Sequence, residues 1–281
     1  GWKANGAVLV SGPDTERKAK TIADIFWKKL NHNYEATRTD MLGSGSIWPE
    51  ALRSGDSNEI LLRFAVRDKD LEKVKDFGKA LSTLILSGPA GMAVTTGGRP
   101  RPSLVVTYWP ALMHRSRVKA KVLVIDTGGD EDFHEITFPI RVQSVAEKKD
   151  RPQPRRRRMT KLTGKSVTVK LQQICYARSG DKGDTCNIGV LARSPQIYDW
   201  LVENLTSARV KTFFKGITLG KVIRYELDNL LGLNFLLEET LGGGGTRSLM
   251  IDPQGKTLAQ ALMQMEVSVP PSLLKSKPVK R

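Results

Sequence analysis

The feature that most constrains the fold of this chain is a break in its pattern between Ala146 and about Lys165. Pro152 and Pro154 stand there beside the four-arginine run Arg155–Arg158. Such a segment has little apolar surface to bury, so it cannot belong to a core. The chain has 281 residues, enough for two ordinary domains. We therefore predict a first unit over residues 1–145, a basic linker over 146–165, a second unit over 166–270 and a basic tail over 271–281.

The positive charge is concentrated in the same unpatterned segments. The formal net charge is +16, of which residues 146–166 contribute +7 and the tail from Lys275 to Arg281 contributes +4. The remaining +5 is too little to predict a dedicated nucleic-acid-binding fold. Arg155–Arg158 predict non-specific affinity for nucleic acid at low salt. No aromatic side chains are interleaved with these arginines, so sequence-specific recognition is not expected.

Several classes of protein are excluded by the composition. No apolar run approaches the length that a bilayer requires, so we predict no membrane span. No secretory signal precedes the first strand-like residues. No serine or cysteine stands in a nucleophile-elbow pattern, so hydrolase chemistry has no support. The chain opens at Gly1 rather than Met, which suggests a fragment, a processed product or an incomplete gene model.

The cysteines and histidines are few and scattered. Cys175 and Cys186, with three histidines, give no zinc-ligand spacing, so no metal site is predicted. A bridge between the two cysteines would require strands that align them. We expect instead two reduced thiols in an intracellular protein, cytoplasmic or mitochondrial.

The first unit alternates strand and helix patterns. Short apolar runs predict strands at Ala7–Val10, Ile60–Val66, Leu104–Tyr108 and Val122–Ile125. Apolar residues at helical spacing predict one helix over Glu16–Leu30, capped by Asp14 and Thr15, and another from a cap at Asp68 to about Leu86. This alternation predicts an α/β unit in which helices cover a sheet.

The patterns of the second unit predict a compact α+β sandwich. Its strand patterns are Val167–Ala177, Asn187–Ala192, Val222–Leu227 and Ser248–Ile251. Its helix patterns begin at Pro195 after a Ser194 cap, cover Leu231–Leu241, and follow Lys256. The resulting order, β-β-α-β-α-β-α, is typical of helices packed on one face of a sheet.

The most unusual local feature is a polar segment predicted to turn between the first two strands of the second unit, Ser179–Asp184. Gly180 and Gly183 permit positive φ, so successive amides could converge on an anion. Lys182 would add a point charge, and Asp181 and Asp184 could serve as acid and base or hold a divalent cation. The alternative is a tight turn whose aspartates bond their own backbone while Lys182 lies in water.

Two glycine-rich segments raise similar alternatives. Gly242–Gly245 are expected between a helix and a strand. They would let the backbone approach a ligand closely, with Thr246 and Arg247 as polar contacts. The alternative is that these glycines only terminate the helix. A Walker-type phosphate loop is excluded because no Gly-Lys-Ser/Thr follows. For Gly97–Arg101 we expect a solvated turn rather than an anion site, and Asp126 either has a catalytic role or begins a turn.

The chain resembles the acyclic terpene utilisation (AtuA-like) family. In the second unit the matching segments are Tyr176–Asp184, Asn187–Gly189, Ala192-Arg193, Leu233–Phe235, Leu241–Gly244, Thr246–Leu249 and Asp252–Lys256. In the first unit they are Gly1–Lys3, Phe26–Lys28, Leu61–Arg63, Ser87–Pro89, Gly97–Pro100 and Tyr108–Pro110. The resemblance implies the later part of the family's large domain followed by its ferredoxin-fold domain. The family's opening half is absent, and the arginine-rich linker departs from its pattern.

The resemblance implies a role in the breakdown of acyclic terpenes or branched acyl-CoA, with no reaction or cofactor named. We predict Asp181, Lys182 and Asp184 as catalytic candidates. The predicted ligand contacts are Ser179, Gly180, Gly183, Asn187, Gly243, Gly244, Thr246 and Arg247. The expected ligand is an acyl-CoA-like anion, and the protein is expected to form a homo-oligomer or complex. The alternative is a non-catalytic interaction module, recruited to a partner or ribonucleoprotein by its basic linker and tail.

Overall fold

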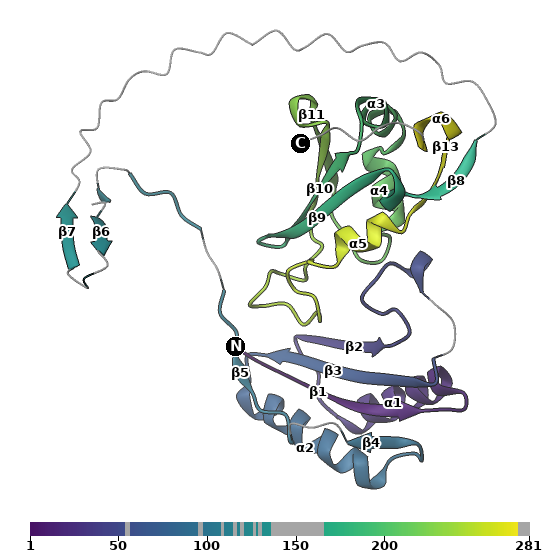
Figure 1. Cartoon of the computed structure of the whole chain (residues 1–281). Helices are drawn as coiled ribbons and strands as arrows, with labels where there is room; N and C mark the ends of the chain where they lie inside the picture. Colours follow the sequence, from purple (N-terminus) through teal and green to yellow (C-terminus); the bar gives the residue numbers. More distant parts are fainter. Residues whose placement is uncertain are drawn as a thin grey trace. The chain divides into compact units, whose positions relative to one another are not determined.

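The computed structural model describes residues 1–53, 57–94, 98–107, 110–114, 117–118, 121–125, 128, 131–135 and 166–274 (Figure 1). The chain divides into two compact units. The larger unit is formed by residues 1–107 together with 158–281, and the smaller by residues 108–157. The arginine run, the tail from Lys275 and Asp126 lie outside the described residues.

The first part of the larger unit is an antiparallel sheet covered by two helices (Figure 1). The strand order is β2-β3-β1-β4, and β5 also pairs with β1. The strands are β1 (Trp2–Ser11), β2 (Ala36–Leu42), β3 (Glu59–Asp68), β4 (Met92–Val94) and β5 (Ser103–Leu104). The helices are α1 (Thr15–Lys29), α2 (Leu71–Ser87) and the 3-10 turn η1 (Glu50–Leu52).

One face of this sheet forms the first core. Ala4, Val8 and Val10 alternate along β1 and are buried against the apolar stripes of α1 and α2. Phe26 of α1 lies 4.3 Å from Phe64 of β3, measured between ring centroids. The periodicity that predicted both helices is therefore confirmed.

The cap of α2 differs from the prediction. Asp70, not Asp68, accepts the N–H of Glu72 and caps the helix. Asp68 instead accepts the backbone N–H groups of Asp70 and Glu35. The bond from Asp70, followed by that from Glu35, lowers the pKa of the Asp68 carboxyl. Asp68 thus holds the capping residue Asp70 in place and does not cap the helix itself.

The second part of the larger unit has a four-stranded antiparallel sheet in the order β11-β12-β10-β9 and a small sheet of β8 and β13. The strands are β8 (Val167–Lys170), β9 (Cys175–Lys182), β10 (Thr185–Ala192), β11 (Val222–Leu227), β12 (Gly232–Leu237) and β13 (Glu266–Val269). The helical segments are η3 (Leu171–Gln173), α3 (Pro195–Asn204), α4 (Ser207–Phe213), η4 (Asp228–Leu230), α5 (Leu258–Met263) and α6 (Pro271–Leu274).

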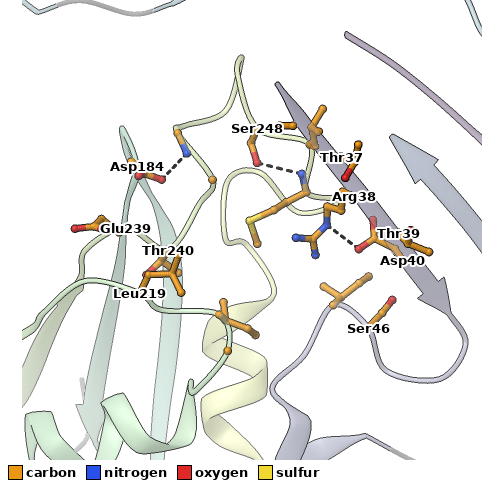
Figure 2. Close-up of a pocket in the computed structure, with 18 of the residues that line it drawn as sticks. Thr37, Arg38, Thr39, Asp40, Ser46, Asp184, Leu219, Glu239, Thr240 and Ser248 are labelled. Atoms are coloured by element: carbon orange, nitrogen blue, oxygen red, sulfur yellow. Dashed lines mark hydrogen bonds and ion pairs between the residues drawn. The ribbon is translucent and has the colours of Figure 1, made fainter. Parts of the chain in front are cut away.

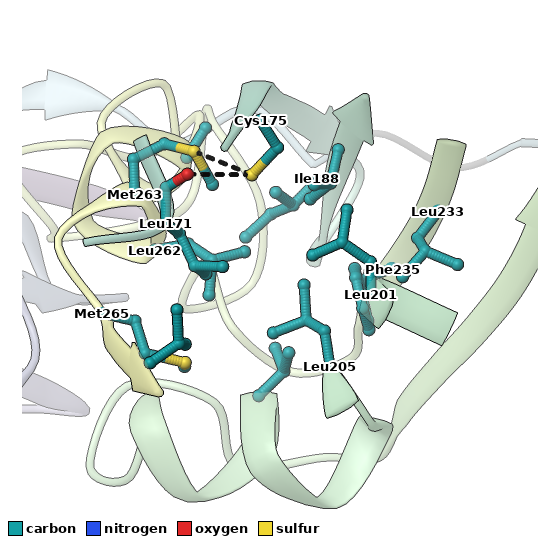
Figure 3. Close-up of a cluster of buried hydrophobic side chains, with 14 of the residues drawn as sticks. Leu171, Cys175, Ile188, Leu201, Leu205, Leu233, Phe235, Leu262, Met263 and Met265 are labelled. Carbon is teal, nitrogen blue, oxygen red and sulfur yellow. Dashed lines mark hydrogen bonds between the residues drawn. The ribbon is translucent and has the colours of Figure 1, made fainter. Parts of the chain in front are cut away.

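The core of this part is formed by one face of the four-stranded sheet and the helices (Figure 3). Along β10, Cys186, Ile188, Val190 and Ala192 are buried, and the residues between them are not. Figure 3 shows Leu201 and Leu205, at the end of α3, close to Phe235 of β12 and Leu262 of α5. Cys175 and Cys186 are both buried and are not bridged to each other, and their reduced state stays a prediction.

Three predictions for the second part are wrong in detail. Leu231–Leu241 is not a helix but contains strand β12, in which Leu233, Phe235 and Leu237 are buried. Ser248–Ile251 is not a strand. The predicted turn Ser179–Asp184 lies largely within strand β9, which pairs in register with β10 up to Lys182 and Thr185. Only Gly183 and Asp184 form the turn, so the backbone of Ser179–Lys182 is extended and does not form an anion-binding nest.

The smaller unit contains the antiparallel pair β6 (Lys121–Ile125) and β7 (Glu131–Glu135). The predicted strand at Val122–Ile125 is therefore confirmed. Taken together, the mixed α/β architecture expected from the sequence is the observed one. None of the described helices combines the length and the apolar character that crossing a bilayer requires.

Candidate functional site

The tip of the β9–β10 hairpin (Gly183 and Asp184) lies against the glycine run (Gly242–Gly245). One carboxylate oxygen of Asp184 accepts the N–H of Gly243 at 2.7 Å and that of Leu241 at 3.1 Å (Figure 2). The carbonyl oxygen of Asp184 also accepts the N–H of Thr240 at 3.0 Å. Asp184 is therefore held by the backbone of the glycine run, and the two segments singled out in the sequence form one structure.

The glycines are required by this arrangement. Gly243 and Gly244 have φ values of 95° and 93°, a region that other residues rarely adopt. A Cβ on Gly244 would lie 3.4 Å from the carbonyl carbon of Gly183. The run follows strand β12 rather than a helix, so the interpretation of these glycines as a helix terminator is wrong.

Beside these loops lies a pocket of about 710 Å³ (Figure 2). Strand β2, the segment after it and Arg67 of β3 form one side of its lining. Residues between Lys215 and Leu219, residues between Gly242 and Met250, and Asp184 form the rest. Among the residues predicted from sequence, Asp184, Gly243 and Arg247 line it. The lining also includes Thr37, Arg38, Thr39, Asp40, Ser46, Trp48, Arg53, Lys215, Glu239, Thr240 and Ser248.

One wall of the pocket is anchored by a buried carboxylate. Asp40 is only 1% exposed and is contacted by Arg38 and Arg63, each at 2.7 Å. The guanidinium of Arg63 also donates to the carbonyl oxygen of Leu249 at 2.9 Å. Each carboxylate oxygen of Asp40 is thus paired with one arginine. Arg63 also connects β3 to the segment that follows the glycine run.

Positive charge is gathered under the glycine run. The ammonium of Lys3 donates to the carbonyl oxygen of Thr246 at 2.6 Å, and Arg67 donates to that of Arg247 at 3.3 Å. Burial lowers the pKa of Lys3, and the nearby Arg63 and Arg67 lower it further. A protonated Lys3 therefore experiences unfavourable positive potential, which an anion bound nearby would relieve.

Two buried donors of residues that line this pocket lack a hydrogen-bond acceptor, although Arg67 Nε lies 3.8 Å from a carboxylate oxygen of Glu35. Among the described residues, three buried side-chain polar atoms lack a hydrogen bond, namely Ser46 Oγ, Arg67 Nε and Arg193 Nε. The first two belong to residues of the same pocket. Buried polar atoms are nearly always satisfied, so such atoms call for an explanation such as a ligand group or water.

The remaining predicted residues are placed elsewhere. Lys182 is exposed, and its ammonium donates to the carbonyl oxygen of Asp181 at 3.0 Å. Asn187 donates from its amide to the amide oxygen of Asn234. Gly180 lies opposite Asn187 in the sheet, in the middle of a strand. None of these residues lines the pocket, although their chemical roles stay predictions.

Two further predicted residues are tied into the fold. The hydroxyl of Ser179 donates to the carbonyl oxygen of Gly255 at 2.6 Å and accepts the N–H of Ala259 at 2.9 Å. Ser179 therefore fixes the start of α5. Thr246 donates from its hydroxyl to the carbonyl oxygen of Val106.

The wall formed by β2 was not predicted from the sequence. Arg38, Asp40 and Ser46 were not predicted, since no strand was expected over Ala36–Leu42. The available signal was weak: Thr37 and Thr39, two β-branched residues separated by one position, favour a strand. Polar residues on both sides of the strand conceal it, because the buried side holds an ion pair instead of apolar residues.

Two family models match the chain. The model described as acyclic terpene utilisation family protein AtuA matches residues 1–124, and that of the AtuA ferredoxin-like domain matches residues 169–268. Comparison with curated proteins and with solved structures gives no match. The two matched ranges correspond to the two predicted segments of resemblance. The chain therefore belongs to the acyclic terpene utilisation family and contains its ferredoxin-like domain.

Proposed function

We propose that the pocket beside the glycine run binds the anionic part of an acyl-CoA-like ligand in the breakdown of acyclic terpenes or branched acyl groups. Family membership supports the pathway. The observation on which the proposal depends is that Ser46 and Arg67 line one pocket and that the buried Ser46 Oγ and Arg67 Nε make no hydrogen bond. Arg67 Nε has only an ion-pair contact with Glu35, at 3.8 Å. No chemical step is assigned.

The lining offers the groups that a phosphate or carboxylate requires. Arg247 has a side chain that is 45% exposed and lies 4.0 Å from Glu35, so it can turn to a ligand at little cost. Lys215 adds a further cation. A guanidinium binds phosphate through two parallel N–H donors, which gives strength and orientation.

Asp184 has a positioning role in this proposal. Its carboxylate holds the backbone of the glycine run, so the run keeps one shape when a ligand arrives. The catalytic roles predicted for Asp181, Lys182 and Asp184 stay predictions. The alternative of an interaction module depends on the linker and the tail, which lie outside the described residues, and it stays a prediction as well.

The test is calorimetric titration with a branched acyl-CoA. Arg247→Gln and Ser46→Ala are each expected to weaken binding by about tenfold or more, because each removes a donor to the anion. Arg17→Gln is the matched control, since Arg17 is 81% exposed on α1 and does not line the pocket. Lys182→Ala separates the pocket from the hairpin tip: the pocket proposal expects unchanged affinity. Equal binding by the Arg247 and Arg17 variants would refute the proposal.

A further inference from the structure

A second and larger pocket lies on the sheet of the first part. Its volume is about 1160 Å³. It is lined by strands β1, β2 and β3, by α2, by Val94 and by residues 98–101, together with Ile251. Asp40 and Leu42, two residues apart on β2, line the first and the second pocket respectively. The two pockets are therefore neighbours with different linings.

Six aliphatic side chains of this second pocket, called its apolar floor below, line it together with the polar Asn5 and Ser82. Its aliphatic side chains are Ala7, Leu42, Leu61, Leu81, Val94 and Ile251. Val94 is 63% exposed and Ile251 is 39% exposed, so the floor is open to solvent at two of these points. Apolar surface in a concave site of this size is typical of ligand pockets.

The charged groups of this pocket are all cations. Its lining contains Arg63, Arg99 and Arg101 and no aspartate or glutamate. Arg63 is neutralised by Asp40 at 2.7 Å. Within the part of the chain that the structure describes, no ion pair occupies Arg99 or Arg101, and both residues are exposed. The free positive charge is therefore at the rim, above an apolar floor.

Pro100 holds these two arginines in place. A Cβ on Gly6 of β1 would lie 2.5 Å from the Pro100 ring, and a Cβ on Gly78 of α2 would lie 2.4 Å from the Pro100 carbonyl oxygen. The segment therefore packs closely on both elements, and only glycine fits at the two contacts. The exposure of Gly98, Arg99 and Arg101 agrees with the solvated turn expected from the sequence, and Pro100 is partly buried between them.

We propose that this pocket binds a free aliphatic carboxylic acid, with its hydrocarbon chain on the apolar floor and its carboxylate between Arg99 and Arg101. Apolar contact stabilises the chain in proportion to the area removed from water. The paired guanidinium groups select a carboxylate over an uncharged head group of similar size. The site is separate from the acyl-CoA pocket and does not depend on it.

The test compares decanoate with decanol, both below the concentration at which they aggregate, by calorimetric titration of the full chain. One saturable site for decanoate is expected, with decanol binding about tenfold more weakly or worse. The double variant Arg99→Gln with Arg101→Gln should lose this preference and bind both ligands equally. Its matched control is Arg17→Gln with Arg178→Gln, two arginines that line neither pocket.

A second set of variants fills the floor. Ile251→Trp should weaken both ligands at least about tenfold, because its ring would occupy the space of the chain. Ala7→Phe serves the same purpose from β1, and thermal melting checks that each variant is folded. Unchanged decanoate binding in both folded variants would overturn the assignment of the floor.

Arg247→Gln distinguishes this inference from the proposed function. It should leave decanoate affinity unchanged while weakening acyl-CoA. If Arg247→Gln abolishes decanoate binding and the Arg99 and Arg101 variants retain it, the carboxylate lies in the first pocket. The inference is then wrong while the proposed function stands. If acyl-CoA fails to bind and decanoate binds as expected, only the proposed function is lost.

Discussion

The carboxylate of Asp184 accepts the backbone N–H of Gly243 at 2.7 Å, across 59 positions of sequence. This bond joins the tip of the β9–β10 hairpin to a run of glycines whose backbone would otherwise have great freedom. The residue that the sequence marked as a candidate acid or base therefore has a clear structural task. The same bond fixes the position of the glycine run, which lines one side of the candidate pocket.

Replacing Asp184 tests this connection. Asp184→Ala removes the acceptor of two N–H groups, and we expect a loss of about 1–3 kcal/mol in the free energy of unfolding. The glycine run should also gain mobility, which hydrogen exchange at Leu241 and Gly243 would detect. Asp24→Ala, on the exposed face of α1, is the control and should change stability by less than about 0.5 kcal/mol. Similar losses in both variants would contradict the role of Asp184.

Arg63 provides a second prediction. It is 8% exposed and joins Asp40 to the carbonyl oxygen of Leu249. Arg63→Met should cost about 3–5 kcal/mol, because it leaves the buried Asp40 with one arginine instead of two. Chemical denaturation measures the loss.

The double variant Arg63→Met with Asp40→Leu is the companion experiment. Removing both charges should restore part of the stability, since Arg38 is 31% exposed and can reach water. A double variant as unstable as the sum of the two single ones would show that the pair has no coupling energy.

Ser179 gives a third prediction. Its hydroxyl accepts the N–H of Ala259 at the start of α5, as a helix-capping residue does, although Ser179 belongs to strand β9 and not to the segment before the helix. Ser179→Ala should lower stability by about 1–2 kcal/mol and leave acyl-CoA affinity unchanged. Ser268→Ala, exposed on β13, is the control. A loss of affinity without a loss of stability would return Ser179 to the ligand site predicted from sequence.

The two thiols predict how stability depends on pH. Burial raises the pKa of Cys175 and of Cys186 from 9.0 to about 12. The folded state therefore retains both thiol protons when the unfolded state has begun to lose them. Their contribution to stability is complete below about pH 9 and is lost as pH rises toward 12.

Two measurements check this statement. Iodoacetamide at pH 8 should label neither cysteine in the native protein and both after unfolding. Between pH 9 and 12 the wild type should lose more stability than a double variant with Cys175→Ala and Cys186→Ala. Parallel curves for the two proteins would mean that the buried thiols do not contribute to the pH dependence.

The sequence by itself determined the elements whose signal is local. The apolar stripes of α1 and α2 recur at helical spacing, and the alternation along β10 has the period of a half-buried strand. The motifs around Ser179–Asp184 and the glycine run were sufficient to identify the family, which the family models confirm. These features depend on residues close together in the chain, so the sequence displays them directly.

Tertiary structure alone decided what distant segments do to each other. Leu231–Leu241 has apolar residues that suit either a helix or a strand, and only pairing with β10 and β11 on its two sides makes it β12. The bond from Gly243 to the carboxylate of Asp184 joins residues 59 positions apart, and nothing in the sequence indicated it. Arg38 had no local signal, because a buried ion pair with Asp40 replaces on β2 the apolar pattern that reveals a strand. Each of these outcomes depends on partners far away in sequence, and no local periodicity records such partners.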